Sequence, residues 1–255
     1  GLLPEDDRQD DKRQQTRRSL LFASTGAALL LGGCTKATKK PAAAESSTDD
    51  FDYQSITATE YLTYEHGILR RILLAYQTAA GHLQTDASVA VAAIAKAASL
   101  FRNFCEDYHE RQVEESLLLP VVRKLEGEVA KYPDILLAQH ERGRQLTDYI
   151  LRLTAGTKSD WLKLPATIGA TVTMFQQHTA REDTVVFPEW KKTLSDHDFD
   201  AISDHFEEIQ ERHFGQDGYA GALKQIVLIE ADLGMTNLAQ FTAPAPSPDH
   251  SPKKS

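Results

Sequence analysis

The sequence predicts an all-α protein built on an up-down-up-down four-helix bundle, with two additional helices at its C-terminal side. Apolar residues recur at alternating spacings of three and four through four stretches of the bundle core, about 57–191. No stretch of useful length alternates with period two, so strands are not expected. The connections between the four stretches are short, which favours antiparallel neighbours. Two further amphipathic stretches, within about 197–235, are expected to pack on the bundle as shorter helices.

The first predicted helix begins at a capping box formed by Thr57 and Glu60, three residues apart. Its apolar face forms one continuous seam, and a histidine lies on it. The residues of this seam are Leu62, His66, Leu69, Leu73, Tyr76 and Ala80.

The other three helices are delimited by similar signals. Asp86 can cap the second helix, which is rich in alanine and ends near Pro120 or slightly later. Pro133 suits the first turn of the third helix, and the fourth follows Ser159. Core-type positions of the fourth helix include a histidine and a glutamate; the seam consists of Ile168, Thr171, Phe175, His178, Glu182 and Val185.

Composition and charge limit the class of protein. The 255 residues are 41% hydrophobic and 25% charged, which is typical of a globular domain with unstructured ends. The formal net charge of −9 leaves no broad basic face to neutralise phosphates. Nucleic acid is therefore not an expected partner.

Residues 1–34 have the pattern of an export signal. Arg17 and Arg18 precede an apolar run, 20–31, that is too short to span a bilayer. The stretch 16–21 resembles a twin-arginine signal, and Leu-Gly-Gly-Cys at 31–34 resembles the lipobox of bacterial lipoproteins. These resemblances imply that Cys34 is a lipid anchor on the periplasmic or outer face of a bacterial membrane. The alternative is a cleaved soluble signal, or an uncleaved one with an incidental cysteine.

The composition divides the rest of the chain into three parts. Residues 35–55 read as a flexible tether, 56–236 as the helical domain and 237–255 as a disordered, proline-rich tail. Only Cys105 then remains in the mature domain, so no intramolecular disulfide is expected. We expect it to be a small buried apolar residue rather than a metal ligand.

Four histidines in four predicted helices indicate a metal site. His178 and Glu182 are four residues apart and share a helical face, and divalent iron accepts such mixed nitrogen and oxygen donors. His66 and His140 lie early in odd helices, whereas His109 and His178 lie late in even ones. In an antiparallel bundle these levels coincide, so the four side chains should converge at one end. A lone histidine on an apolar seam is usually structural, but four at one level with glutamates nearby are not.

The second and fourth helices also look like each other. In this pseudo-repeat His109, Glu110, Glu114, Glu115 and Leu117 to Pro120 echo His178, Glu182, Asp183 and Val185 to Pro188. With it, the chain from about Thr57 to Pro188 resembles the hemerythrin-like HHE cation-binding family. In the stretch 65–71 and in Gln139, His140 and Arg144 it is similar to the exported bacterial branch of that family. That family holds a non-haem iron pair in a four-helix bundle through histidine and carboxylate ligands. The stretch 214–219 is also typical of the branch, without an assignable chemistry.

The resemblance implies His66, His140 and His178 as metal ligands, together with Glu182 or Asp183. On the second helix three candidates stay open, namely His109, Glu110 and Glu114. Glu110 and Glu114 have the i and i+4 spacing of one helical face. His109 and Glu114 are five residues apart and share a face only if the helix carries a π-bulge.

The resemblance implies a membrane-anchored, non-catalytic protein whose di-iron centre senses, stores or buffers dioxygen, nitric oxide or iron. Arg144 stands where oxygen-carrying hemerythrins have a second histidine, and a guanidinium cannot coordinate a metal, so reversible dioxygen carriage is not expected. A di-iron oxidase or peroxidase, or a nitric oxide-reducing enzyme, is the alternative. Ferritin-like oxidases need two E-x-x-H motifs, and only Glu106 to His109 supplies one. A metal-free helical interaction module would leave the four histidines unexplained.

Overall fold

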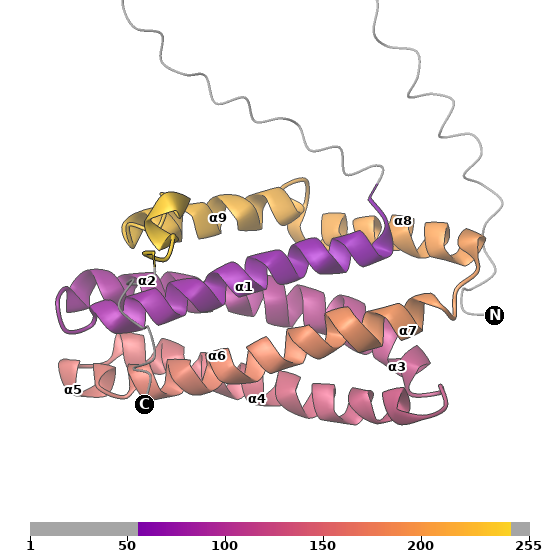
Figure 1. Ribbon diagram of the computed structural model, residues 1–255, viewed down its shortest axis with the longest axis horizontal. Coiled ribbons are helices and arrows are strands. Elements are labelled where there is room, and N and C mark those ends of the chain that lie inside the picture. The colour runs from indigo at the N-terminus through magenta and orange to yellow at the C-terminus, as the bar shows by residue number, and fades with distance from the viewer. Residues whose placement is uncertain (1–55, 246–255) are drawn as a thin grey trace, which may run out of the picture. The chain divides into compact units, whose positions relative to one another are not determined.

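The computed structural model describes residues 56–245, and every regular element within that range is a helix (Figure 1). The predicted all-α class is confirmed. The predicted signal at 1–34, the tether at 35–55 and the last ten residues of the tail lie outside the described residues.

Four long helical segments form an antiparallel bundle (Figure 1). The first is α1, which packs against the second and the fourth, and the third packs against the same two. Short helices occupy two connections, η4 at Glu128–Lys131 and α5 at Lys158–Trp161. The long segments are α1 Ala58–His82, α2 Ala87–Leu100 continued by η3 Phe101–Leu118 and α3 Leu119–Val122, α4 Tyr132–Ala155, and α6 Leu164–Arg181 continued by η5 Glu182–Val186 and α7 Phe187–Lys191.

Both predicted N-terminal caps are present. Thr57 and Glu60 form the capping box of α1, with the Thr57 backbone N–H donating to Glu60 Oε2 at 2.9 Å. Asp86 Oδ1 accepts from the Val89 backbone N–H at 3.3 Å at the start of α2. These caps satisfy backbone donors that a helix cannot satisfy internally.

The start of the fourth long helix differs from the prediction. Ser159 belongs to the separate short helix α5, and α6 begins only at Leu164. Pro165 explains the break, because its ring would clash with the carbonyl of Trp161, four residues earlier, in a continuous helix. In the first turn of α6 the same proline is well tolerated, since no intrahelical partner awaits its missing N–H.

Two segments of the bundle have π-helical rather than α-helical turns. In η3 the hydrogen bonds reach one residue further, so that the Leu119 N–H donates to the Glu114 carbonyl. In η5 the Phe187 N–H likewise donates to the Glu182 carbonyl. A π-helical turn places residues five apart on one face, and such turns occur frequently at functional sites.

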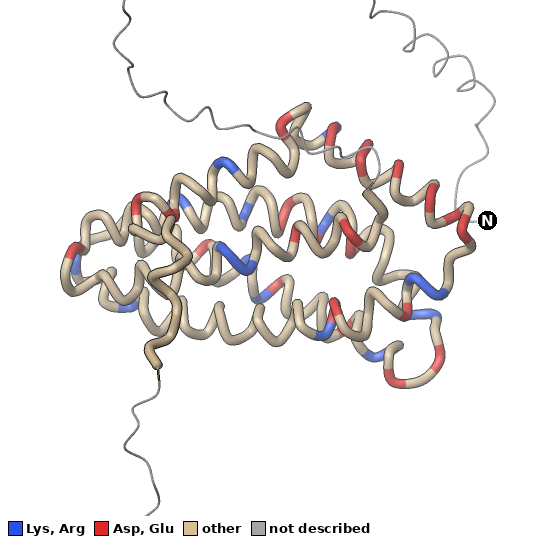
Figure 2. Tube along the Cα trace, turned by 45° about the horizontal axis from the view of Figure 1, so that its top comes forward, with Lys and Arg blue, Asp and Glu red and all other residues tan. Residues whose placement is uncertain are grey.

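Two appended helices, α8 Asp196–Phe214 and α9 Gly218–Asp232, pack on the bundle as predicted. Both contact α1, while α8 also contacts η3 and α9 contacts α2. Acidic residues are spread along α8 (Figure 2). Within the predicted tail, the described residues 237–245 contain a 3₁₀ helix, η6 Leu238–Phe241, rather than only irregular chain. Asn237 caps this helix with a side-chain hydrogen bond, which accounts for the local order.

The continuous helix Ala87–Val122 is long and apolar enough to cross a membrane. However, 56% of its most apolar stretch is buried inside the fold. A core helix of a bundle has the same character, so this helix is weak evidence for a membrane span.

Candidate metal centre

The four histidines lie together in the bundle core, one from each long helical segment. None is more than 3% exposed. They form two pairs: the rings of His66 and His109 are 4.9 Å apart between centroids, and those of His140 and His178 are also 4.9 Å apart. In the second pair the two Nε2 atoms are 3.2 Å apart.

Two fully buried carboxylates join the pairs. Glu114 places Oε1 at 3.2 Å from His109 Nε2 and Oε2 at 3.2 Å from His140 Nε2. Glu182 places Oε1 at 3.0 Å from His178 Nε2 and Oε2 at 3.5 Å from His66 Nε2. Each carboxylate therefore reaches one histidine of each pair, which is how a carboxylate shared between two cations would be arranged.

The other nitrogen of each histidine ring, Nδ1, is held by a neighbouring helix. A carboxylate or amide oxygen there favours Nδ1 as the donor, so that Nε2 faces the centre and offers its lone pair to a metal once it is deprotonated. The pairs are His66 with Asp183 Oδ1 at 2.8 Å, His109 with Glu65 Oε2 at 2.7 Å, His140 with Glu115 Oε1 at 3.0 Å and His178 with Gln139 Oε1 at 2.9 Å.

Buried atoms without hydrogen bonds gather at the same point. Among the described residues they include Nε2 of His66 and His109 and both carboxylate oxygens of Glu114 and Glu182. Leaving such atoms unpaired in a core is unfavourable, and a cation would satisfy all of them. Two groups fit two adjacent cations: one is Glu114, His140, His178 and Glu182, the other His66, His109 and Glu114, each with its donor atoms within 4.8 Å of one another. A third group of the described residues, Glu110, Glu115 and His140, meets the same distance limit.

A family model decides the relationship of this fold and site. The model of the hemerythrin HHE cation binding domain matches residues 57–190. The chain belongs to the hemerythrin HHE cation-binding family. Metal binding by this HHE domain is therefore supported both by the family and by the buried histidine and glutamate groups.

The HHE protein is also similar to uncharacterized proteins of mycobacteria. These are Rv1995 and MT2051 of Mycobacterium tuberculosis and Mb2018 of Mycobacterium bovis, each 37% identical over 193 residues. The likeness covers 73% of this chain and 74% of each relative, so it extends beyond the residues of the HHE match. No solved structure matches the chain.

The π-helical turns of η3 set the positions of the three candidates of the second helix. They place His109 and Glu114, five residues apart, on the face toward the centre. Glu110 instead contacts Arg144, with 3.2 Å between Oε2 and Nη1. Burial raises the pKa of Glu110 to about 8.

The fourth helix offered Glu182 or Asp183, and the structure gives them different places. Glu182 faces the Nε2 atoms of the histidines, whereas Asp183 holds His66 from behind and pairs with Arg70. Asp183 therefore contacts the ring of His66 on the side away from the centre and orients that histidine.

The sequence analysis gave Glu65, Gln139 and Glu115 no role at the metal centre. Each lies directly beside a candidate ligand in the sequence but holds a histidine of another helix. Glu65, for example, directly precedes His66 in the chain, but its side chain forms a hydrogen bond with His109. Adjacency to a ligand on the same helix was the available signal, since such a side chain points to the neighbouring helix.

Three polar or thiol side chains near the centre, those of Arg144, Glu106 and Cys105, do not take part in the candidate metal groups of the described residues. Arg144 donates to Glu115 at 2.9 Å and so is held in an ion pair. Glu106, the glutamate of the single E-x-x-H motif, accepts from Thr147 at 2.6 Å and pairs with Arg102. Cys105 is buried, which raises the pKa of its thiol well above its usual value, and it joins none of the potential metal groups of the described residues.

The pKa values of the groups at the centre are shifted in different directions. Burial lowers the pKa of His66 to about 4. For His140 burial also acts downward, but Glu110, Glu114 and Glu115 outweigh it and raise the pKa to about 10. Burial alone would raise the pKa of Glu114, yet His109 and His140 hold it well below its usual value. A metal ion would have to displace a proton from His140 but not from His66 near neutral pH, which makes binding pH-dependent.

A glycine allows the third and fourth helices to approach at the centre. A Cβ on Gly143 would lie 2.6 Å from Phe175 Cζ. Gly143 follows His140 by three residues, and Phe175 precedes His178 by three. The close approach therefore lies one helical turn from the His140–His178 contact.

Proposed function

We propose that this HHE protein is a membrane-anchored, non-catalytic protein that holds a di-iron centre and uses it to sense, store or buffer dioxygen, nitric oxide or iron. The observation that carries the proposal is the pair of carboxylates, Glu114 and Glu182, each reaching histidines of both pairs. Iron in such a site supplies redox chemistry and a coordination position for a diatomic ligand.

The donor set supports two iron ions rather than one. His66 and His109 would hold one ion, and His140 and His178 the other, with Glu114 and Glu182 shared. Four imidazole nitrogens with carboxylate oxygens suit iron, and the family is usually an iron binder.

An enzymatic role as a di-iron oxidase, peroxidase or nitric oxide reductase has less support. The glutamate of the single E-x-x-H motif, Glu106, is turned toward Thr147 and Arg102 instead of the histidines. A metal-free interaction module would leave the buried oxygens of Glu114 and Glu182 unpaired.

Reconstitution of the full chain with ferrous iron tests the centre. We expect two iron ions per chain, with Mössbauer spectra of a coupled pair. His140→Ala should lose at least one ion, whereas His82→Ala, which removes an exposed histidine, should keep both. A wild-type chain that binds no iron would refute the proposal, and a chain saturating at one ion would refute its di-iron form.

Export and anchoring belong to the same proposal. Their support is the twin-arginine-like stretch at 16–21 and the lipobox-like stretch ending at Cys34. Expression in a bacterium should place the chain in the membrane fraction, and Cys34→Ser should release it. Equal membrane association of both forms would contradict anchoring through this cysteine.

A further inference from the structure

We infer that the appended helix α8 helps to orient a ligand of the metal centre. Its residue Gln210 positions His109 through Tyr108 and Glu65. The inference rests on the proposed metal-binding function and concerns one of its two cation positions. It assigns a role to a helix that lies outside the matched HHE residues 57–190.

A continuous chain of hydrogen bonds joins α8 to the centre. Gln210 Nε2 donates to Tyr108 Oη at 3.3 Å, and Tyr108 Oη donates to Glu65 Oε1 at 2.6 Å. The other oxygen of Glu65 accepts from His109 Nδ1 at 2.7 Å. All four side chains are buried, with Gln210 the most exposed at 9%. Water therefore competes poorly for these hydrogen bonds.

The turn between α8 and α9 holds the far side of Gln210. Its Oε1 accepts from the backbone N–H of Tyr219 at 3.2 Å. A Cβ on Gly218, whose φ is +32°, would lie only 2.3 Å from the same oxygen. The glycine therefore makes room for the amide that reaches Tyr108.

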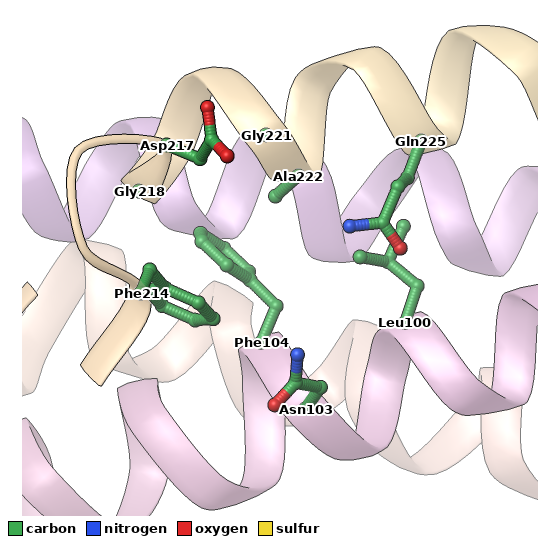
Figure 3. Close-up of a pocket in the computed structure, with 9 residues that line it drawn as sticks. All are labelled: Leu100, Asn103, Phe104, Phe214, Asp217, Gly218, Gly221, Ala222 and Gln225. Atoms are coloured by element: carbon green, nitrogen blue, oxygen red, sulfur yellow. The ribbon is translucent and has the colours of Figure 1, made fainter.

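Aromatic packing fixes Tyr108 against the same turn. The ring of Phe214 meets Tyr108 edge-on at 5.1 Å and stacks on Phe104 at 5.7 Å. Figure 3 shows these two phenylalanines beside the first turn of α9, where Gly218 and Ala222 help to leave a cavity of about 210 Å³. The stretch 214–219, to which the sequence assigned no chemistry, thus supports the hydrogen-bonded chain.

Of the four histidines, only His109 is held, among the described residues, through a chain of contacts that reaches α8. Among the other outer partners, Glu115 is held by Arg144 and Asp183 by Arg70, and both arginines belong to the bundle. Glu65 is held by Tyr108, which is in turn fixed by α8. Losing the Tyr108 hydroxyl should therefore disturb His109 and its cation, not the cation of His140 and His178.

The expected loss of iron affinity follows from the known effect of residues that form hydrogen bonds with metal ligands. Such partners orient the ligand and set its basicity, and replacing them typically weakens metal binding about 10- to 100-fold. Tyr108→Phe removes only the hydroxyl that holds Glu65. Tyr76→Phe is a matched control, because Tyr76 is equally buried and its hydroxyl makes no hydrogen bond among the described residues.

Ferrous iron titration of the full-length chain tests the inference, with the two sites resolved by Mössbauer spectroscopy. Tyr108→Phe should weaken one bound ion about tenfold or more and leave the other unchanged, while Tyr76→Phe leaves both unchanged. If the wild type binds no iron, the proposed function itself fails. If the wild type binds two ions and Tyr108→Phe matches Tyr76→Phe, or weakens both ions equally, only the inference is overturned.

A second pair of variants works from the α8–α9 turn and does not touch Tyr108. Gly218→Ala should displace the Gln210 amide and weaken the same ion selectively. Gly215→Ala is the control, because Gly215 also has a positive φ, +66°, but nothing lies within 4 Å of its added Cβ. The two glycine variants test the inference even if Tyr108→Phe does not fold. Equal iron binding by Gly218→Ala and Gly215→Ala would overturn it.

Discussion

Replacing Gly143 by alanine should fail to stabilise the bundle, although alanine normally favours a helix interior over glycine. The added Cβ would lie 2.6 Å from Phe175 Cζ and 3.1 Å from Cε2, well inside the ordinary contact distance of about 3.5–4.0 Å. The ring cannot easily move away, because Phe175 is fully buried and contacts the rings of Phe101 at 4.8 Å and His178 at 5.5 Å.

Two effects of opposite sign set the magnitude. Alanine in place of glycine favours a helix interior by about 1 kcal/mol. Overpacking a well-packed core costs about 1–3 kcal/mol. Gly143→Ala should therefore range from neutral to about 2 kcal/mol destabilising. Gly169→Ala on α6 has nothing within 4 Å of its added Cβ, so it should show only the stabilising effect.

Urea denaturation of the metal-free protein measures both variants against the wild type. The difference in unfolding free energy between Gly143→Ala and Gly169→Ala isolates the clash, and we expect about 1–3 kcal/mol. Equal stabilities would show that α4 and α6 do not approach at Gly143 as described. The close contact of His140 with His178, one turn away, would then lose its structural basis.

Two further outcomes follow from buried groups. Thr147→Val should lower the unfolding free energy by about 1–3 kcal/mol in thermal melts, because Glu106 loses the hydroxyl that donates to it at 2.6 Å; an unchanged melt would contradict that contact. In a full-length Cys34→Ser chain, a thiol reagent should modify Cys105 only after unfolding, since the thiol is 1% exposed and its pKa is raised by burial. Rapid labelling of the native protein would show that this cysteine is accessible.

The sequence by itself determined the features that depend on local chemistry. Helical periodicity predicted the all-α class, and Thr57 and Asp86 marked helix starts because a cap bonds backbone groups within its own first turn. The level of the four histidines was also predictable, because the rise per residue of a helix is constant. The fourth helix was predicted to begin a few residues too early, because Ser159 lies inside the short α5, which Thr157 caps, and Pro165 separates α5 from α6.

Only the tertiary structure decided which side chains face the centre. The placement of His109 beside Glu114 depends on a shift from α-helical to π-helical hydrogen bonds, which no local signal in the sequence specifies. Likewise, Glu65 lies next to His66 in the chain but holds His109, because its side chain points to the neighbouring helix. The contact of Gln210 with Tyr108 joins residues 102 positions apart, and spacing along one helix carries no information about such a contact.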